Sequence, residues 1–430
     1  MPSVDTGLTI SPLEHSAGFG AIVRGVDLNN LSDSDFKQIE YALYKYRLLV
    51  IKDQSDLHPQ KQYELNCAFD PEATGKHGHG NAKEVMKKFK GKHNLTGGLP
   101  KTDLFFPPRP VQMVRIVGRG HLPAGHYGTE EPLELKSGSH QAWHKDPLTD
   151  TELKSGITRF QRWHIDAQLS KGNHTARVTT IYAHKLPQGP PVNLRWDDGS
   201  GLSMPVAPGR TAFIDSAKMY EALSDEDKKW VDHSLVEVRF PLRTFSALQN
   251  QTDGRRETQY APSPYSFIIN CKGTSNGFGI VSDDLETPLD ELPIKEEDAE
   301  VLPLVWRNPV TGEKHLQFHQ IVVRKIHYKE SEEGAVRVND DLREVRKMLD
   351  DLQRPFLRPE NIIIAPQEET DLAVWLNRGT RHSAIEFPES YGTRIMHQCH
   401  LQGSDPVQAP WPLEGQPNPL GLKRPEEVVV

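Results

Sequence analysis

The sequence contains few cysteines and no long apolar segment. Its three cysteines, Cys67, Cys271 and Cys399, are odd in number and far apart in 430 residues, which argues against a disulfide framework and against a CxxC-type zinc site. No apolar run approaches the roughly 18 residues that a membrane-spanning helix needs, and the N-terminus lacks a basic region followed by an apolar core. We therefore expect a soluble, cytoplasmic protein of a reducing compartment, with no membrane partner.

The sequence also lacks an excess of positive charge. Lysine and arginine total 51 against 59 aspartates and glutamates, which gives a formal net charge of −8. A chain of this balance has no general attraction to phosphate backbones, so we expect no nucleic-acid partner. The expected partner is a small-molecule substrate. A homo-oligomer stays open, because nothing in the sequence places a subunit interface.

The first seventy residues predict helices on either side of a strand. Ser32 precedes apolar residues at helical spacing, which predicts a helix that runs to Tyr46. A short buried strand follows over residues 47–54, and His58 and Pro59 open a second helix. Two later helices are predicted, one after Ser224 and one over about 339–354, where leucines and a valine form a helical stripe.

From about residue 106 the pattern changes to short apolar segments separated by turns. These segments are rich in valine, isoleucine, threonine and aromatics, which favours a mainly β fold with flanking helices, of the sandwich or jelly-roll type. We expect a single domain over residues 1–430, with a loop insertion at about 72–105, an insertion or lid at about 250–300, and a Pro-rich C-terminal tail at about 406–430. The predicted strands cover residues 111–118, 158–166, 176–186, 210–215, 234–240, 302–308, 315–323, 371–379 and 394–403.

One short His-x-Asp pattern could contribute two ligands to a metal ion. His164 and Asp166 lie two residues apart in a predicted strand, where alternate side chains share a face. With a second histidine from a neighbouring strand, they would form the 2-His-1-carboxylate arrangement that binds iron(II) and leaves positions open. His144 and Asp146 repeat the pattern, but Pro147 and the polar residues around them indicate a loop. The alternative for His164 is a structural histidine that is hydrogen-bonded to a carboxylate.

Several longer segments resemble a known family. The stretch PLEHSAGFGAIVRGVDLNNLSDSDFKQIEYALYKYRLLVIKDQ is similar to the start of the taurine dioxygenase (TauD/TfdA) family of iron(II)- and 2-oxoglutarate-dependent oxygenases. NRGTRHSA, RIMHQ and GSDP resemble the ending of that family, and PGRTAFIDSAKMYEALS resembles its segment with a cofactor-binding threonine. FQRWHIDA and PLVWRNPVTGEKHLQ look closer still to its fungal xanthine dioxygenase branch.

The resemblance implies a double-stranded β-helix (jelly-roll) core and a set of site residues. Fe(II) would be the metal, and 2-oxoglutarate and O2 the cosubstrates. A guanidinium matches a carboxylate in a bidentate manner, which suits an arginine that pairs with the far carboxylate of 2-oxoglutarate. Carried over by position, the implied residues are His164, Asp166 and His382 for the metal and for catalysis, Thr211 and Arg394 for 2-oxoglutarate, and Gln398, His400 and Lys154 for the substrate.

The substrate stays open between two classes. Gln398 stands where taurine dioxygenase has an arginine for a sulfonate, which disfavours a sulfonate, and the xanthine branch has a glutamine there. His400 replaces an asparagine of that branch, and Lys154 and Ser155 stand in place of its acidic pair. We therefore expect oxidation of a C–H bond in a small polar substrate such as an amino acid, by hydroxylation or oxidative cyclisation in fungal secondary metabolism. The alternatives are a xanthine or purine hydroxylase, a non-catalytic jelly-roll binding protein and a hydrolytic zinc enzyme.

Overall fold

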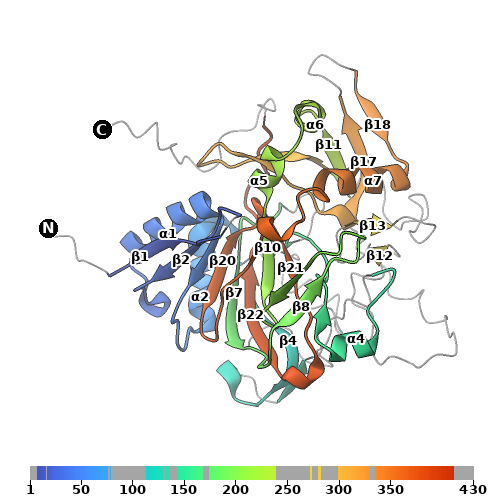
Figure 1. Ribbon diagram of the computed structural model, residues 1–430. Coiled ribbons are helices and arrows are strands. Elements are labelled where there is room, and N and C mark those ends of the chain that lie inside the picture. The colour runs from blue at the N-terminus through green and yellow to red at the C-terminus, as the bar shows by residue number, and fades with distance from the viewer. Residues whose placement is uncertain are drawn as a thin grey trace.

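The chain folds mostly into sheets, with few helices (Figure 1). The computed structural model describes residues 7–15, 17–75, 78, 113–128, 132–135, 144–167, 174–238, 272–273, 279–281, 299–329 and 335–410. The mainly β fold with flanking helices that the sequence predicts is confirmed. Most of the expected insertions at 72–105 and 250–300, and most of the expected tail at 406–430, lie outside the described residues.

The largest sheet has eight strands, all antiparallel to their neighbours except for β2 and β3, which pair in parallel. Two helices, α1 (Asp33–Tyr46) and α2 (Pro59–Phe69), lie against one face of it, and Ile39 and Leu43 of α1 share a buried cluster with Tyr182 and Val374 of the sheet (Figure 1). In spatial order the strands are β1 (Thr9–Pro12), β2 (Ala21–Arg24), β3 (Leu48–Ile51), β20 (Leu372–Leu376), β7 (Val178–Lys185), β22 (Arg394–His400), β4 (Val114–Leu122) and β5 (Leu133–Leu135).

The opposite face of the main sheet packs against a small antiparallel sheet. In this sheet β10 (Thr211–Asp215) lies between β19 (Ile362–Ile364) and β21 (Thr380–Ala384). Phe213 of β10 shares one buried cluster with Ile181, Trp375 and Met396 of the main sheet. The apolar layer between the two sheets therefore holds β10 and β21 in fixed positions relative to β22.

A second core lies beyond the small sheet, and the helices α5 (Ser216–Glu221), α6 (Asp225–Val231) and α7 (Leu342–Gln353) border it. Val345 and Leu349 of α7 are fully buried in it. The other described elements are α4 (Asp150–Lys154), β6 (Ile157–Thr158), β8 (Val192–Arg195), β9 (Ser203–Val206), β11 (Leu235–Val238), β12 (Lys272–Gly273), β13 (Ile280–Val281), β14 (Glu300–Pro303), β15 (Val305–Arg307), β16 (Lys314–Leu316), β17 (Val323–Tyr328) and β18 (Arg337–Asn339), with short 3-10 helices at Leu28–Asn30, Pro71–Ala73, His126–Gly128, Gln320–Val322, Pro359–Asn361 and Glu389–Tyr391.

The helices were predictable because their start signals are local. Ser32 accepts a hydrogen bond from the backbone N–H of Asp35 at the start of α1, and Ser224 caps α6 in the same way. The segment over about 339–354 forms α7, capped by Asp341. None of the helices that the structure describes is long and apolar enough to cross a membrane.

Three predicted strands are wrong as continuous elements. Residues 302–308 contain the end of β14 and then β15, which belong to different sheets. Residues 315–323 divide into β16, the 3-10 helix Gln320–Val322 and the start of β17. Residues 158–166 contain the end of β6 and then two isolated bridges, Phe160 with Ile385 and His164 with His382. Apolar composition alone cannot distinguish such segments from strands, because bridges and 3-10 turns bury the same side chains.

A buried ion pair links the two layers. Arg47, which ends α1 in a left-handed conformation, donates from Nε and Nη2 to Oδ2 of Asp215 at 3.0 and 2.7 Å. The Asp215 side chain has no exposed surface, and that of Arg47 is 6% exposed. Asp215 also accepts from the N–H of Ala217 at the start of α5, so this carboxylate joins β10, α5 and the residue before β3 of the main sheet.

We expect Arg47→Met to lower the free energy of unfolding by about 3–5 kcal/mol, because it leaves Asp215 buried without a cation. Chemical denaturation of the purified variant measures this. The matched control is Arg24→Met, which removes an exposed pair with Asp53 and should cost less than about 1 kcal/mol. Equal losses in the two variants would contradict the anchoring role of Arg47.

Candidate functional site

Three side chains from two distant segments converge between the sheets. One potential ligand atom each from His164, Asp166 and His382 lies within 4.8 Å of the other two. These three residues are called the metal group below. His382 Nε2 is 3.5 Å from Asp166 Oδ2, and His164 Nε2 is 3.9 Å from Asp166 Oδ1. His164 is the most exposed of the three side chains, at 16%, so solvent can reach the three residues from the side of His164.

Backbone pairing brings these segments together. The N–H of His164 donates to the carbonyl of His382 at 3.0 Å, and the N–H of His382 donates back to the carbonyl of His164 at the same distance. His382 lies in β21, opposite Phe213 of β10, so its position follows from the small sheet. The two histidine rings lie with centroids 4.1 Å apart.

The backbone of Asp166 is hydrogen-bonded by the side chain of Asn377 and not by a neighbouring strand. It sits in a bend, where its N–H donates to Asn377 Oδ1 at 2.8 Å and its carbonyl accepts from Asn377 Nδ2 at 2.9 Å. The same Asn377 Nδ2 donates to the carbonyl of Ala176. The predicted regular strand at Asp166 is wrong, but Asn377 supplies the hydrogen bonds to the backbone of Asp166 that a neighbouring strand would have supplied.

The surroundings keep the histidines neutral and the aspartate ionised. Burial lowers the pKa of His382, and it lowers the pKa of His164 well below its ordinary value. Burial alone would raise the pKa of Asp166, but the nearby His382, His400 and Arg115 bring it below its ordinary value. Neutral imidazole and carboxylate are the protonation states that bind a metal ion. The donor set therefore fits Fe(II).

Aromatic rings fix the orientation of His382. The ring of Trp375 lies 4.9 Å from it, and that of Phe213 stacks on it at 5.9 Å with an interplanar angle of 26°. Both rings belong to the apolar layer between the sheets. The imidazole is therefore positioned by the core of the protein, which limits the rotamers that it can adopt.

The two candidate cofactor residues lie close to each other. Arg394 Nε donates to the carbonyl of Gly209 at 2.6 Å, two residues before Thr211. Thr211 opens β10 and is on the same face of that strand as Phe213, which stacks on His382. Burial and the neighbouring Arg210 lower the pKa of Arg394 to about 10, so the guanidinium stays charged at neutral pH.

The candidate substrate residues differ in their placement. Gln398 Nε2 donates to Asp166 Oδ2 at 3.1 Å, so this glutamine contacts the metal group itself. His400 is fully buried two residues further along β22, and the N–H of Gly78 donates to its carbonyl at 3.1 Å. A Cβ atom at position 78 would lie 2.2 Å from the His400 ring, so only glycine fits there. Lys154 is exposed in the last turn of α4.

Three further residues at the site were not predicted from the sequence. His319 is 6% exposed, its ring centroid lies 6.2 Å from that of His164, and neither of its nitrogens has a hydrogen-bond partner among the described residues. The charge of Arg162 lowers the pKa values of His164, His319 and His382, so its guanidinium is near all three. Arg115 of β4 pairs in register with Gln398, which puts their side chains on one face.

Only one of these three had a signal in the sequence. Arg162 precedes His164 by two residues, the spacing that the argument for Asp166 also used. His319 and Arg115 reach the site through long-range packing, and nothing local distinguishes them from other residues of apolar segments.

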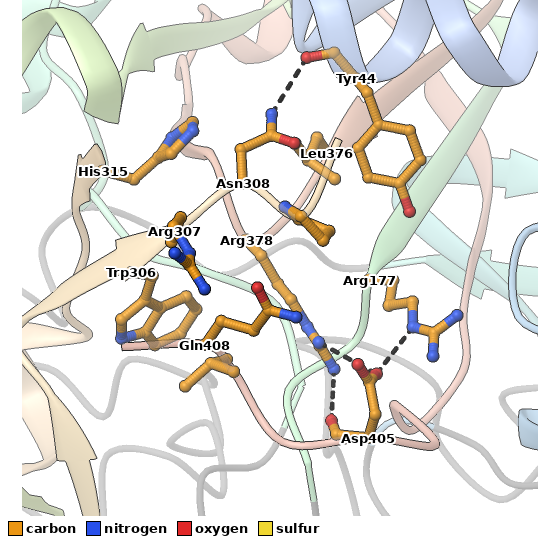
Figure 2. Close-up of a pocket in the computed structure, with 12 residues that line it drawn as sticks. Tyr44, Arg177, Trp306, Arg307, Asn308, His315, Leu376, Arg378, Asp405 and Gln408 are labelled. Atoms are coloured by element: carbon orange, nitrogen blue, oxygen red, sulfur yellow. Dashed lines mark hydrogen bonds and ion pairs between the residues drawn. The ribbon is translucent and has the colours of Figure 1, made fainter. Parts of the chain in front are cut away.

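A separate pocket lies on the far side of the segment that contains Asn377. Leu376 and Arg378 line it together with Trp306, His315 and Gln408 (Figure 2). Two of its arginines share one carboxylate, because Asp405 Oδ1 accepts from Arg177 at 2.7 Å and from Arg378 at 3.1 Å. The pocket contains no member of the metal group, and its internal ion pairs favour a structural role.

A mostly β fold that gathers two histidines and one carboxylate is typical of non-haem iron oxygenases. The family model for the taurine catabolism dioxygenase TauD, TfdA family matches residues 9–400. The chain therefore belongs to this family, as the resemblance in the sequence predicts. It is an oxidoreductase that uses Fe(II), 2-oxoglutarate and O2.

The chain is similar to curated fungal relatives over nearly its whole length. It is 38% identical to an alpha-ketoglutarate-dependent xanthine dioxygenase of Emericella nidulans, over 93% of this chain and 98% of the relative. It is 37% identical to a xanthine dioxygenase of Neurospora crassa, over 100% of this chain and 95% of the relative. A crystal structure of a taurine dioxygenase from Burkholderia xenovorans aligns with a TM-score of 0.47 at 18% identity, over 93% of each chain.

Asn377→Leu should weaken iron binding by about 10- to 100-fold, the usual effect of removing a group that orients a metal ligand. Without the amide, Asp166 loses both of its backbone partners at this position. Anaerobic iron titration of the folded variant measures the affinity. Asn193→Leu, at an exposed position of β8, is the control and should bind iron like the parent protein. Parental affinity in Asn377→Leu would show that Asp166 is held by other contacts.

Proposed function

We propose that His164, Asp166 and His382 are the iron ligands of this dioxygenase. The observation that carries this proposal is the convergence of their ligand atoms within 4.8 Å in a buried group. When bound, the iron with 2-oxoglutarate and O2 supplies the oxidising chemistry, with release of succinate and CO2. The main sheet and the small sheet β19–β10–β21 are, in this proposal, the two layers of the double-stranded β-helix, within one domain that spans the chain.

Arg394 and Thr211 are proposed to bind the far carboxylate of 2-oxoglutarate. The support is their shared position beside Gly209 and the charge that Arg394 keeps at neutral pH. A Cβ atom on Gly209, whose φ is +67°, would lie 2.5 Å from Pro187 and 3.3 Å from Arg394 Cδ. The glycine therefore permits the close approach that orients the guanidinium.

For the substrate, we propose a small carboxylate-bearing molecule of the amino-acid class. Arg162 and Arg115 both act electrostatically on members of the metal group, and a carboxylate is the natural partner of a guanidinium near such a centre. His319 offers a buried imidazole that can donate to or accept from a polar group of the substrate. Gln398 and His400 are the other proposed contacts, and hydroxylation and oxidative cyclisation are both compatible outcomes.

Xanthine hydroxylation is the second candidate, supported by the named activity of the relatives at 37–38% identity and by Gln398 at the metal group. Succinate production by the anaerobically iron-loaded enzyme in air separates the two candidates, with xanthine and a panel of amino acids added separately. Stimulation by one amino acid supports the first candidate, and stimulation by xanthine supports the second. Slow succinate release without stimulation by any addition would reject both substrate classes and keep the cofactor site.

His164→Ala and Asp166→Ala should each abolish succinate production, because each removes one of three iron ligands. Both variants should keep the circular dichroism spectrum of the parent protein, since neither side chain belongs to an apolar cluster. Asp146→Ala is the matched control, because it alters the other His-x-Asp pair at an exposed position and should leave activity intact. Parental activity in Asp166→Ala would overturn the assignment of the ligands.

Arg162→Gln should raise the KM for a carboxylate substrate by about 10- to 100-fold, which corresponds to the loss of a charge-assisted hydrogen bond. The KM for 2-oxoglutarate should stay unchanged, because Arg394 is proposed to bind that carboxylate. Steady-state kinetics on the stimulating substrate measures both constants. Lys154→Gln is the control at the exposed lysine. An effect of Lys154→Gln without an effect of Arg162→Gln would restore the assignment made from the sequence.

A further inference from the structure

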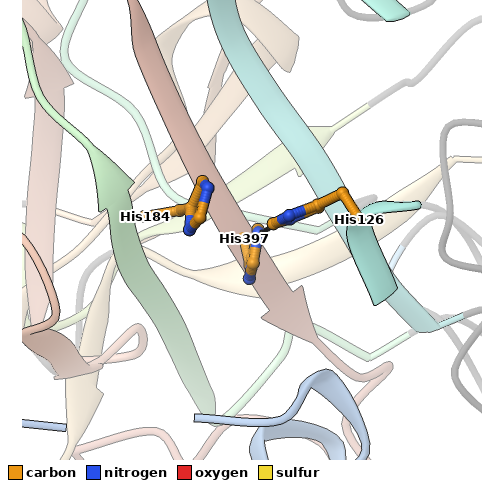
Figure 3. A group of neighbouring side chains, drawn as sticks. All are labelled: His126, His184 and His397. Carbon is orange, nitrogen blue, oxygen red and sulfur yellow. Dashed lines mark hydrogen bonds between the residues drawn. The ribbon is translucent and has the colours of Figure 1, made fainter. Parts of the chain in front are cut away.

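A second group of potential metal ligands lies on the other face of the main sheet. His126, His184 and His397 each place one ring nitrogen within 4.8 Å of the other two (Figure 3). His184 is near the end of β7, His397 is in the middle of β22, and His126 is in the 3-10 helix that follows β4. Three elements far apart in the sequence therefore contribute one imidazole each.

The alternation of side chains along β22 separates this group from the proposed iron site. Gln398 contacts Asp166 on the inner face, so its neighbour His397 points to the outer face, as do Ile395 and Cys399 of the outer cluster. On β7, Tyr182 is the register partner of His397 and packs in the cluster under α1, and His184 follows it on that face. The two groups of ligands are thus on opposite sides of one strand.

The ring nitrogens are close enough for a common ion. Nε2 of His126 and Nε2 of His397 lie 2.9 Å apart. Two imidazole ligands at about 2.0–2.1 Å from a zinc ion would be separated by about 3.3 Å in tetrahedral geometry, so a shift of a few tenths of an ångström suffices. The side chain of His184 makes no hydrogen bond among the described residues, and its ring centroid lies 4.3 Å from that of His126.

The surroundings suit a bound cation with one open position. His397 is fully buried, whereas His126 and His184 are half-buried, so a fourth position is accessible to water. Tyr127 packs edge-on against both His126 and His397, which restricts the two rings. Lys185, the neighbour of His184 in β7, pairs with Glu369 at 3.2 Å.

The protonation states agree with this geometry. Burial, with the neighbouring His184, lowers the pKa of His126 to about 4. Burial also lowers the pKa values of His184 and of His397. All three imidazoles are therefore neutral at physiological pH, and their ring nitrogens can bind a metal ion without first losing a proton.

We propose that His126, His184 and His397 form a second metal site, which takes a borderline transition-metal ion such as Zn²⁺. Three imidazoles without a carboxylate disfavour magnesium and calcium, which prefer oxygen ligands, and three ligands with an open fourth position match the coordination of zinc. A metal ion here would join β4, β7 and β22. Since β22 also carries Arg394 and Gln398, this ion would stiffen the strand that supports the proposed iron site.

Zinc stoichiometry of the full-length chain tests the proposal. After equilibrium dialysis at micromolar free Zn²⁺, elemental analysis should find one ion fewer in His184→Ala than in the parent chain. Asp166→Ala should also lose one ion, and the double variant should lose both. His121→Ala, which removes an exposed histidine of β4, is the matched control and should keep the parental number. Because the comparison is between His184→Ala and His121→Ala, it does not depend on the iron-site assignment.

Equal zinc content in His184→Ala and His121→Ala would overturn the proposal. Thermal unfolding gives a second measurement in the Asp166→Ala background, where Zn²⁺ should raise the Tm. This rise should disappear with His126→Ala or with His184→Ala, so that one variant remains informative if the other does not fold. An undiminished rise in a folded variant would show that zinc binds elsewhere and would overturn the proposal.

Discussion

The reciprocal backbone hydrogen bonds between His164 and His382 are the constraint on which the site depends. They join two segments that are more than two hundred residues apart in the sequence, and they fix the distance between two of the three proposed ligands. A single bridge of this kind is weak by itself, since each hydrogen bond contributes about 1 kcal/mol net. It persists because β21 is held by β10, and β10 by the apolar layer and the Arg47–Asp215 pair. The packing of the core therefore fixes the positions of His164 and His382 relative to each other.

The helices and the metal group could be predicted from the sequence for different reasons. Helix starts depend on neighbours within four residues, so Ser32, Ser224 and the apolar stripe of α7 were sufficient. His164, Asp166 and His382 came from a short motif and from family resemblance, and the structure brings them together. The strand on which the motif was placed does not exist as predicted, because Asn377 replaces strand pairing at Asp166. Side-chain bonds between residues 211 positions apart leave no local signal.

The contacts around the metal group were harder to predict, since they follow from packing. His319 lies in a segment whose apolar composition predicts a strand, and the 3-10 turn that follows it brings it near His164. Lys154 was a candidate because Lys154 and Ser155 stand in place of the acidic pair of the xanthine branch, yet Lys154 is exposed in α4. Arg162 and Arg115 are the cations that reach the group. Arg162 is close to the motif in the sequence and could have been predicted, whereas His319 and Arg115 reach the site only through long-range packing.

The charge balance of the centre supports an anionic substrate in addition to 2-oxoglutarate. Among the candidate site residues of the described chain, Asp166 is the one carboxylate. Arg115 acts electrostatically on Asp166 and Arg162 on His164, while Arg394 lies at the start of β22, against Gly209. A bound Fe(II) ion adds two further positive charges, while 2-oxoglutarate brings two negative ones, of which Arg394 is proposed to hold one. The positive charge of the metal ion and of the nearby arginines supports the proposed carboxylate-bearing substrate over a neutral apolar one.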